Sequence, residues 1–187
     1  EQGESLDLYE NSYALLIGVS RYSERWANLN NIPYELDQVE GALKKQGFTK
    51  IVRVVNPTDK QLRAAFENFI DEYGYDKNNR LLFYYSGHGY SFKGDTLGYL
   101  VPSDAPNPND DEKGFFRKAL TMEDILTWSR KMKAKHALFL FDSCFSGTIF
   151  QSKSTPVPRD IDQYSALPVR QYMTAGGSTD EVPAKST

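Results

Sequence analysis

One histidine and one cysteine stand in glycine-bracketed segments that could support nucleophilic chemistry. His88 lies in Ser-Gly-His-Gly and Cys144 in Asp-Ser-Cys-Phe-Ser-Gly, each three residues past an apolar run. If the two runs are neighbouring parallel strands, both side chains reach the same rim of a sheet. A thiol is mostly protonated near neutral pH, and an adjacent imidazole raises its thiolate fraction or accepts its proton during attack. The pair therefore predicts a cysteine nucleophile with a histidine base.

The glycines that flank the two motifs indicate how such a site could bind a substrate backbone and an oxyanion. Gly89 and Gly147 permit sharp turns and close approach of a substrate backbone. The backbone N–H groups of Gly89 and Cys144 could then hold the oxyanion of a tetrahedral intermediate. Taken singly, a cysteine after a strand is usually a small core residue and a loop histidine is usually solvated. Their joint placement favours catalysis, whereas we expect His136, with nothing reactive beside it, to be structural.

Four apolar runs have the length of buried strands, and amphipathic segments separate them. The runs are Tyr13–Val19, Ile51–Val55, Leu81–Tyr85 and Ala137–Phe141. Helical spacing predicts helices over Tyr34–Gln46, Thr58–Tyr73 and Thr121–Trp128. The stretch Gly87–Gly114 predicts mostly loop with a short hairpin around Leu97–Val101, and Val169–Thr174 predicts one more strand. This alternation predicts an α/β fold with a mostly parallel central sheet covered on both faces.

Length, charge and cysteine content exclude several classes of protein. The chain has 187 residues, with 22 Lys+Arg against 25 Asp+Glu, which suits one domain and gives no basic face for nucleic acid. Its single cysteine excludes an intrachain disulfide, so we expect a reducing, cytoplasmic location. The apolar runs are far shorter than the roughly 20 residues of a membrane span, so we expect no membrane partner.

The two segments together resemble the catalytic motifs of caspase-like cysteine peptidases, most closely those of metacaspases and their bacterial relatives. The resemblance rests on Tyr-Tyr-Ser-Gly-His-Gly at 84–89 and Asp-Ser-Cys-Phe-Ser-Gly at 142–147, with His88 and Cys144 separated by 56 positions. Residues 14–19 and 36–39 also resemble the family's first strand and helix. The resemblance implies a caspase-type α/β/α sandwich and an endopeptidase with His88 and Cys144 as its catalytic dyad.

The resemblance also implies how the chain is divided. The peptidase domain would cover 13–176, after an N-terminal extension at 1–12 and before a C-terminal loop at 177–187. The polar, proline-bearing segment 151–160 corresponds to the linker between large and small subunits. We expect the sandwich to lack its C-terminal strand and helices, and whether a separate small-subunit chain supplies them is left open.

An acid in the cysteine motif implies a substrate preference. Aspartate-cleaving caspases have Gln-Ala-Cys where this chain has Asp142-Ser143-Cys144, and in metacaspases and paracaspases an Asp at that position lines the pocket for the residue before the cut bond. Asp37 matches a second pocket acid of metacaspases, although it could instead be a solvated helix acid. Two recessed carboxylates favour a cation, so the implied substrates are proteins or peptides cut after Arg or Lys.

Two further features concern processing and metals. Lys153 and Arg159 in the linker are candidates for self-cleavage, because caspase-like enzymes often cut themselves there; the alternative is that both are ordinary solubilising charges. Asp110, Asp111 and Glu112 form an acidic loop without the ordered oxygen-ligand pattern of a calcium site. We therefore expect no metal and no cofactor, with calcium as the alternative because several metacaspases need it.

Two rival functions belong to other classes. A catalytically silent caspase-like module would bind partners only, but the intact histidine and cysteine argue against it. An unrelated α/β hydrolase for small molecules is disfavoured, because the sequence contains no Gly-x-Ser-x-Gly elbow and no phosphate-binding glycine loop.

Overall fold

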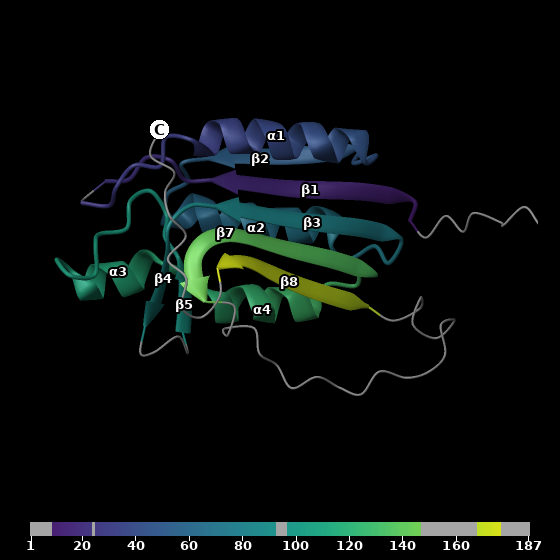
Figure 1. The fold of residues 1–187 in the computed structure, drawn as a ribbon. Coiled ribbons are helices and arrows are strands. Elements are labelled where there is room, and N and C mark those ends of the chain that lie inside the picture. The colour runs from purple at the N-terminus through teal and green to yellow at the C-terminus, as the bar shows by residue number, and fades with distance from the viewer. Residues whose placement is uncertain (1–8, 24, 93–96, 147–167, 177–187) are drawn as a thin grey trace, which may run out of the picture.

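The structure is a computed structural model that describes residues 9–23, 25–92, 97–146 and 168–176. The first half contains β1 (Asn11–Gly18), α1 (Ile32–Lys45), β2 (Lys50–Val55), α2 (Asp59–Tyr73), β3 (Asn79–Ser86) and β4 (Gly89–Phe92). The second half contains β5 (Leu97–Leu100), α3 (Glu112–Lys118), β6 (Leu120–Thr121), α4 (Met122–Lys131), β7 (His136–Ser146) and β8 (Val169–Gly176). Figure 1 shows these elements around one main sheet.

The main sheet has five strands in the order β2-β1-β3-β7-β8, and every neighbouring pair is parallel. It contains the four predicted strands and the additional one predicted at Val169–Thr174. Crossover helices connect strands in a parallel sheet, which is why α1, α2 and α4 flank it (Figure 1). The predicted α/β fold with a mostly parallel sheet is therefore confirmed.

Alternation along the strands divides the core between the two faces of the sheet. Leu15 and Phe83 pack on the face covered by α2 and α4, whereas Leu16 and Leu82 pack on the face covered by α1. Because successive strand residues point to opposite faces, a continuous apolar run is needed to bury both. Phe83 and Phe139 stack at a centroid distance of 4.3 Å across β3 and β7. Burial of each such ring contributes about 2–3 kcal/mol.

The stretch Gly87–Gly114 differs from the prediction of mostly loop. It contains β4 and β5, which form a three-stranded antiparallel sheet with β6, and the start of α3. Tyr90 and Tyr99 pack edge-on against the fully buried Phe115 of α3. The Asp111 side chain caps α3 by accepting a hydrogen bond from Gly114 N–H at 2.9 Å. Aromatic packing thus outweighs the turn-forming composition of this stretch.

Among the described residues, no helix has the length and apolar character that a membrane crossing requires.

Candidate active site

The sheet brings the two predicted catalytic motifs to one edge. β3 and β7 are direct neighbours, with Ser86 of β3 opposite Asp142 of β7. The Gly87 N–H continues the pairing by donating to the Asp142 carbonyl at 3.2 Å. His88 and Cys144 each follow two residues after this matched pair, as expected for motifs on neighbouring parallel strands. The side chain of Cys144 lies outside the described residues, so its role as nucleophile stays a prediction.

The His88 imidazole is oriented by a backbone carbonyl. Its Nε2 lies 2.8 Å from the carbonyl oxygen of Ala27, in the segment after β1. A carbonyl can only accept, so Nε2 carries a hydrogen and the neutral ring keeps its lone pair on Nδ1. Burial lowers the pKa of His88, against the opposing effect of the Ala27 carbonyl. At neutral pH the ring is therefore an unprotonated base with Nδ1 as its basic atom.

Two aromatic side chains from the same segment hold the ring of His88. The ring centroids of Tyr22 and Trp26 lie 4.8 Å and 5.1 Å from that of His88. Trp26 is itself fixed by donating its Nε1–H to the Ala105 carbonyl at 3.1 Å. Tyr22 and Trp26 were not predicted from the sequence to contact His88. Two aromatic residues in a polar segment directly after a strand were the available signal, but their spacing gave no link to His88.

Two tyrosine hydroxyls fix the backbone of His88 as well. The Tyr22 hydroxyl accepts a hydrogen bond from His88 N–H at 2.7 Å. The buried Tyr85 hydroxyl lies 3.0 Å from the carbonyls of both His88 and Val101, to which it donates. These contacts explain the glycine of the motif, because a Cβ on Gly87 would lie 2.7 Å and 2.8 Å from the two hydroxyl oxygens. The glycine is required by close packing.

Gly89, predicted to supply an oxyanion-binding N–H, opens β4 and is paired with Leu100 of β5. It is half-buried and one residue from His88. The oxyanion roles of Gly89 and Cys144 stay predictions.

The acid of the cysteine motif and an acid of α1 both contact side chains at the carboxyl end of β3. Asp142 is half-buried, and its Oδ2 accepts a long hydrogen bond from the Tyr84 hydroxyl at 3.4 Å. Glu35 of α1 accepts a hydrogen bond from Ser86 Oγ at 3.1 Å, and Ser86 is opposite Asp142. Burial, followed by the negative charge of Asp142 and then that of Glu35, raises the pKa of Tyr84 well above 10. Both acids therefore act on one hydroxyl, and they form a local negative site at the sheet edge.

Asp37, the predicted second pocket acid, has a different surrounding. Its carboxylate pairs with Arg53 of β2 at 2.5 Å, and its side chain is 61% exposed. Arg53 also contacts Glu40 at 3.4 Å. The α1 acid that reaches the strand-end residues is Glu35, two positions earlier. Positions two apart on a helix point in different directions. The sequence does not show which of these directions faces the strand ends, so it could not show which acid reaches them.

The acidic loop considered for calcium has protein partners. Asp110 pairs with Arg25 at 3.1 Å, and Asp111 caps α3. No group of three or more His, Cys, Asp or Glu side chains in the described ranges is arranged to hold a metal ion. The expectation of a metal-free, cofactor-free site stays a prediction.

Lys153 and Arg159 lie outside the described residues, as does the linker 151–160. His136 opens β7, and its Nδ1 lies 2.6 Å from the Tyr9 hydroxyl. That contact agrees with the structural role expected for His136.

Most of the chain is similar to known proteins. A family model described as Caspase domain (Peptidase_C14) matches residues 11–184. The human protein named Mucosa-associated lymphoid tissue lymphoma translocation protein 1 is 31% identical over 144 residues, which cover 77% of this chain and 16% of that protein. Its mouse homolog is 30% identical over 137 residues, which cover 73% of this chain and 15% of that protein. The chain thus spans about a sixth of the length of the curated relatives it matches.

Proposed function

Because the chain belongs to the caspase-domain family of peptidases, we propose that it is a cysteine endopeptidase that cuts polypeptides after Arg or Lys. The observation that best supports the proposal is the pairing of Ser86 with Asp142, since it brings the His88 and Cys144 motifs to one edge. The oriented, unprotonated imidazole beside this edge supplies the base that a thiol nucleophile needs.

The proposed reaction proceeds through an acyl-enzyme. Nδ1 of His88 accepts the thiol proton of Cys144, and the thiolate attacks the scissile carbonyl carbon. Backbone N–H groups of Gly89 and Cys144 hold the oxyanion. When the intermediate collapses, the C–N bond breaks and the amine leaves with the proton held by His88. A water molecule then gives a proton to His88 and attacks the thioester carbon. The C–S bond breaks, the carboxylic acid product leaves, and His88 returns the proton to the Cys144 sulfur.

The proposed substrate preference depends on the two acids beside Tyr84. Asp142 and Glu35 are both half-buried and come from different elements, β7 and α1. A recessed pair of carboxylates selects a cationic side chain, and the forked guanidinium of Arg can contact both. An Asp before the cut bond would be repelled.

Fluorogenic peptides with Arg, Lys, Asp or Leu before the reporter test this proposal, each with and without calcium. Hydrolysis of the Arg and Lys peptides alone would support it. Preference for Asp or Leu would contradict the pocket assignment. If none of the four peptides is cleaved, the alternative of a catalytically silent interaction module is favoured.

The pH dependence of kcat/KM on an Arg peptide should follow the lowered pKa of His88. Burial favours the neutral ring, so the base stays active as the pH falls from 7 and is lost only below the ordinary value of 6.5. We expect the acidic limb of the profile to have its midpoint below 6.5. Phe in place of Trp26 should move that midpoint toward 6.5, because removing the larger ring exposes the imidazole. A midpoint at or above 6.5 in the unaltered protein would contradict the role of buried His88 as base.

Self-cleavage after Lys153 or Arg159 is the expected consequence of a preference for basic residues. We expect intact-mass spectra of the active protein to show two fragments whose sum matches the chain plus one water, and the Cys144→Ala protein to stay whole. Replacing both Lys153 and Arg159 by Gln should keep the active protein whole while leaving peptide hydrolysis measurable. Fragments in the Cys144→Ala sample would indicate a contaminating protease, and an uncut active protein would refute self-processing.

A further inference from the structure

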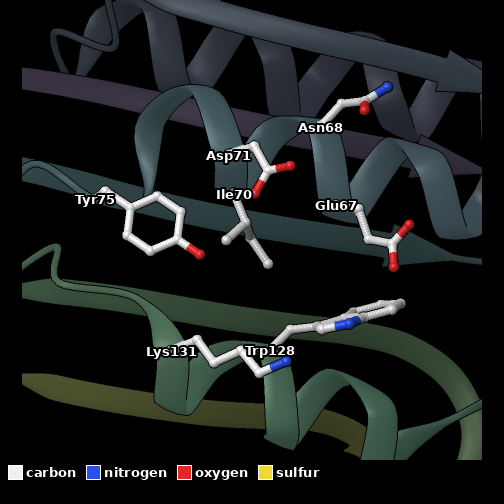
Figure 2. Close-up of a pocket in the computed structure, with 7 residues that line it drawn as sticks. All are labelled: Glu67, Asn68, Ile70, Asp71, Tyr75, Trp128 and Lys131. Atoms are coloured by element: carbon white, nitrogen blue, oxygen red, sulfur yellow. The ribbon is translucent and has the colours of Figure 1, made fainter.

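A groove lies between α2 and α4, on the face of the sheet opposite α1. It has a volume of about 250 Å³ and is lined by Glu67, Asn68, Ile70, Asp71, Tyr75, Trp128 and Lys131. This volume is below the roughly 300–1,000 Å³ of sites for small molecules and cofactors, so it suits one or two protein side chains. Figure 2 shows the α2 side chains on one side of the space and Trp128 with Lys131 of α4 on the other.

The groove opens on the helical face of the sheet and does not include the proposed catalytic edge. Tyr75 precedes the first residue of β3, and Lys131 precedes β7, so both lie near the amino ends of the strands. His88 follows the carboxyl end of β3, which has eight residues. At about 3.3 Å per residue, this end of the groove is roughly 25 Å from His88 along the strand direction. The other end is closer, because Trp128 stacks on Phe66, which stacks on Phe83 in the middle of β3. A ligand in the groove therefore does not occupy the proposed substrate pocket.

The groove combines an apolar floor with two exposed carboxylates. Ile70 is 5% exposed, Tyr75 is 47% exposed, and the Trp128 indole stacks on the buried Phe66 at 5.9 Å. Glu67 and Asp71 lie one helical turn apart on α2 and are exposed, as is Lys131. Within the described ranges no ion pair is formed by these two acids. Like charges at this spacing repel weakly, and a bound cation would relieve the repulsion.

We propose that this groove docks an arginine-bearing segment of a partner protein. Arg suits the lining in two ways: its planar guanidinium stacks on the indole of Trp128, and its forked N–H groups pair with the carboxylates of Glu67 and Asp71. Lys131 is the cation of the lining and competes with the guest for these acids. The groove therefore binds an isolated arginine weakly and depends on further contacts in the partner.

The two tryptophans of the chain allow both sites to be observed in one experiment. Trp128 lines the groove and Trp26 contacts His88, so their indole N–H signals in a ¹⁵N-labelled protein report the two places separately. The probe is acetyl-Ala-Arg-Ala-amide, added to the Cys144→Ala protein so that it is not cut. Its citrulline counterpart has the same shape without the charge, and Trp128→Phe assigns the signals.

We expect the Trp128 signal to shift saturably with the arginine peptide and not with the citrulline peptide. Changing Glu67→Gln and Asp71→Asn together should weaken this binding about tenfold, as expected for two exposed charges. The matched control changes two exposed acids elsewhere, Glu112→Gln and Glu123→Gln, and should leave it unaltered. Lys131→Gln should strengthen binding, because it removes the competing cation.

Several outcomes would overturn the proposal. A Trp128 signal that is unmoved while the Trp26 signal shifts would refute the groove and leave the proposed peptidase pocket standing. An equal response to the citrulline peptide would show an apolar site without selection for a cation. Weaker binding in Lys131→Gln would show that the groove recognises an anion.

Discussion

Replacing Cys144 by Ala should abolish peptide hydrolysis while the protein stays folded. The substitution removes the thiol that forms the acyl-enzyme, and loss of the nucleophile in such a dyad costs at least about 10³-fold in kcat. His88→Ala should lower kcat by a similar factor at neutral pH, because the thiol then lacks a base. Single-turnover and steady-state assays with the Arg reporter measure both effects.

The double variant provides the internal control. Residues that act as a unit are strongly non-additive, so Cys144→Ala with His88→Ala should be hardly slower than either single variant. Circular dichroism spectra like that of the unaltered protein would show that the sheet is intact. Substantial activity in Cys144→Ala would rule out a cysteine peptidase with this nucleophile.

Asp142→Asn should remove most hydrolysis after Arg. The guanidinium of the substrate would still lose its hydration on binding beside Tyr84, but it would no longer pair with the Asp142 carboxylate. We therefore expect kcat/KM to fall by about 10²- to 10³-fold. Glu35→Gln should cost about tenfold, since Glu35 contributes charge from α1 and contacts the strand end through Ser86. The peptide panel described above provides the measurement, with Leu as the uncharged reference.

Asp37→Asn serves as the matched control for these two changes. Its carboxylate is exposed and paired with Arg53, so the substitution should alter kcat/KM for Arg by less than about twofold. A large loss in Asp37→Asn with little loss in Glu35→Gln would reverse the assignment and restore the pocket inferred from the metacaspase resemblance. Retained Arg cleavage in Asp142→Asn would refute the pocket altogether.

The main sheet was predictable because its signals are local. Runs such as Leu81–Tyr85 are apolar throughout, and a strand buried on both faces requires that pattern. The small sheet was less predictable, because β4 and β5 are four residues each and depend on packing against Phe115 from a later helix. Composition indicates turns in that stretch, and contacts distant in sequence outweigh it.

The candidate site also contains some residues that could be predicted from the sequence and others that could not. His88 and Cys144 could be located because each lies at a fixed offset from a strand that the sequence reveals. The contact of Glu35 with Ser86 could not be predicted, since it depends on how α1 is rotated against the sheet. The pocket role of Asp37 stays a prediction. Tyr22 acts on His88 across 66 positions, and no spacing rule in the sequence connects them.

The orientation of the His88 imidazole depends on contacts with a loop segment, whereas the main sheet is held by the hydrogen bonds between its strands. The contacts of this imidazole come from the segment after β1. Hydrogen bonds that attach this segment to the rest of the protein include those from Ser23 N–H to the Ser103 carbonyl at 2.7 Å and from Trp26 Nε1–H to the Ala105 carbonyl at 3.1 Å. Such loop contacts can open locally at a lower free energy than global unfolding requires. The imidazole can thus lose its orientation while the strands keep their hydrogen bonds. Catalytic competence would then be governed by a local opening equilibrium, and conditions that leave the fold unaltered could switch the population of competent molecules.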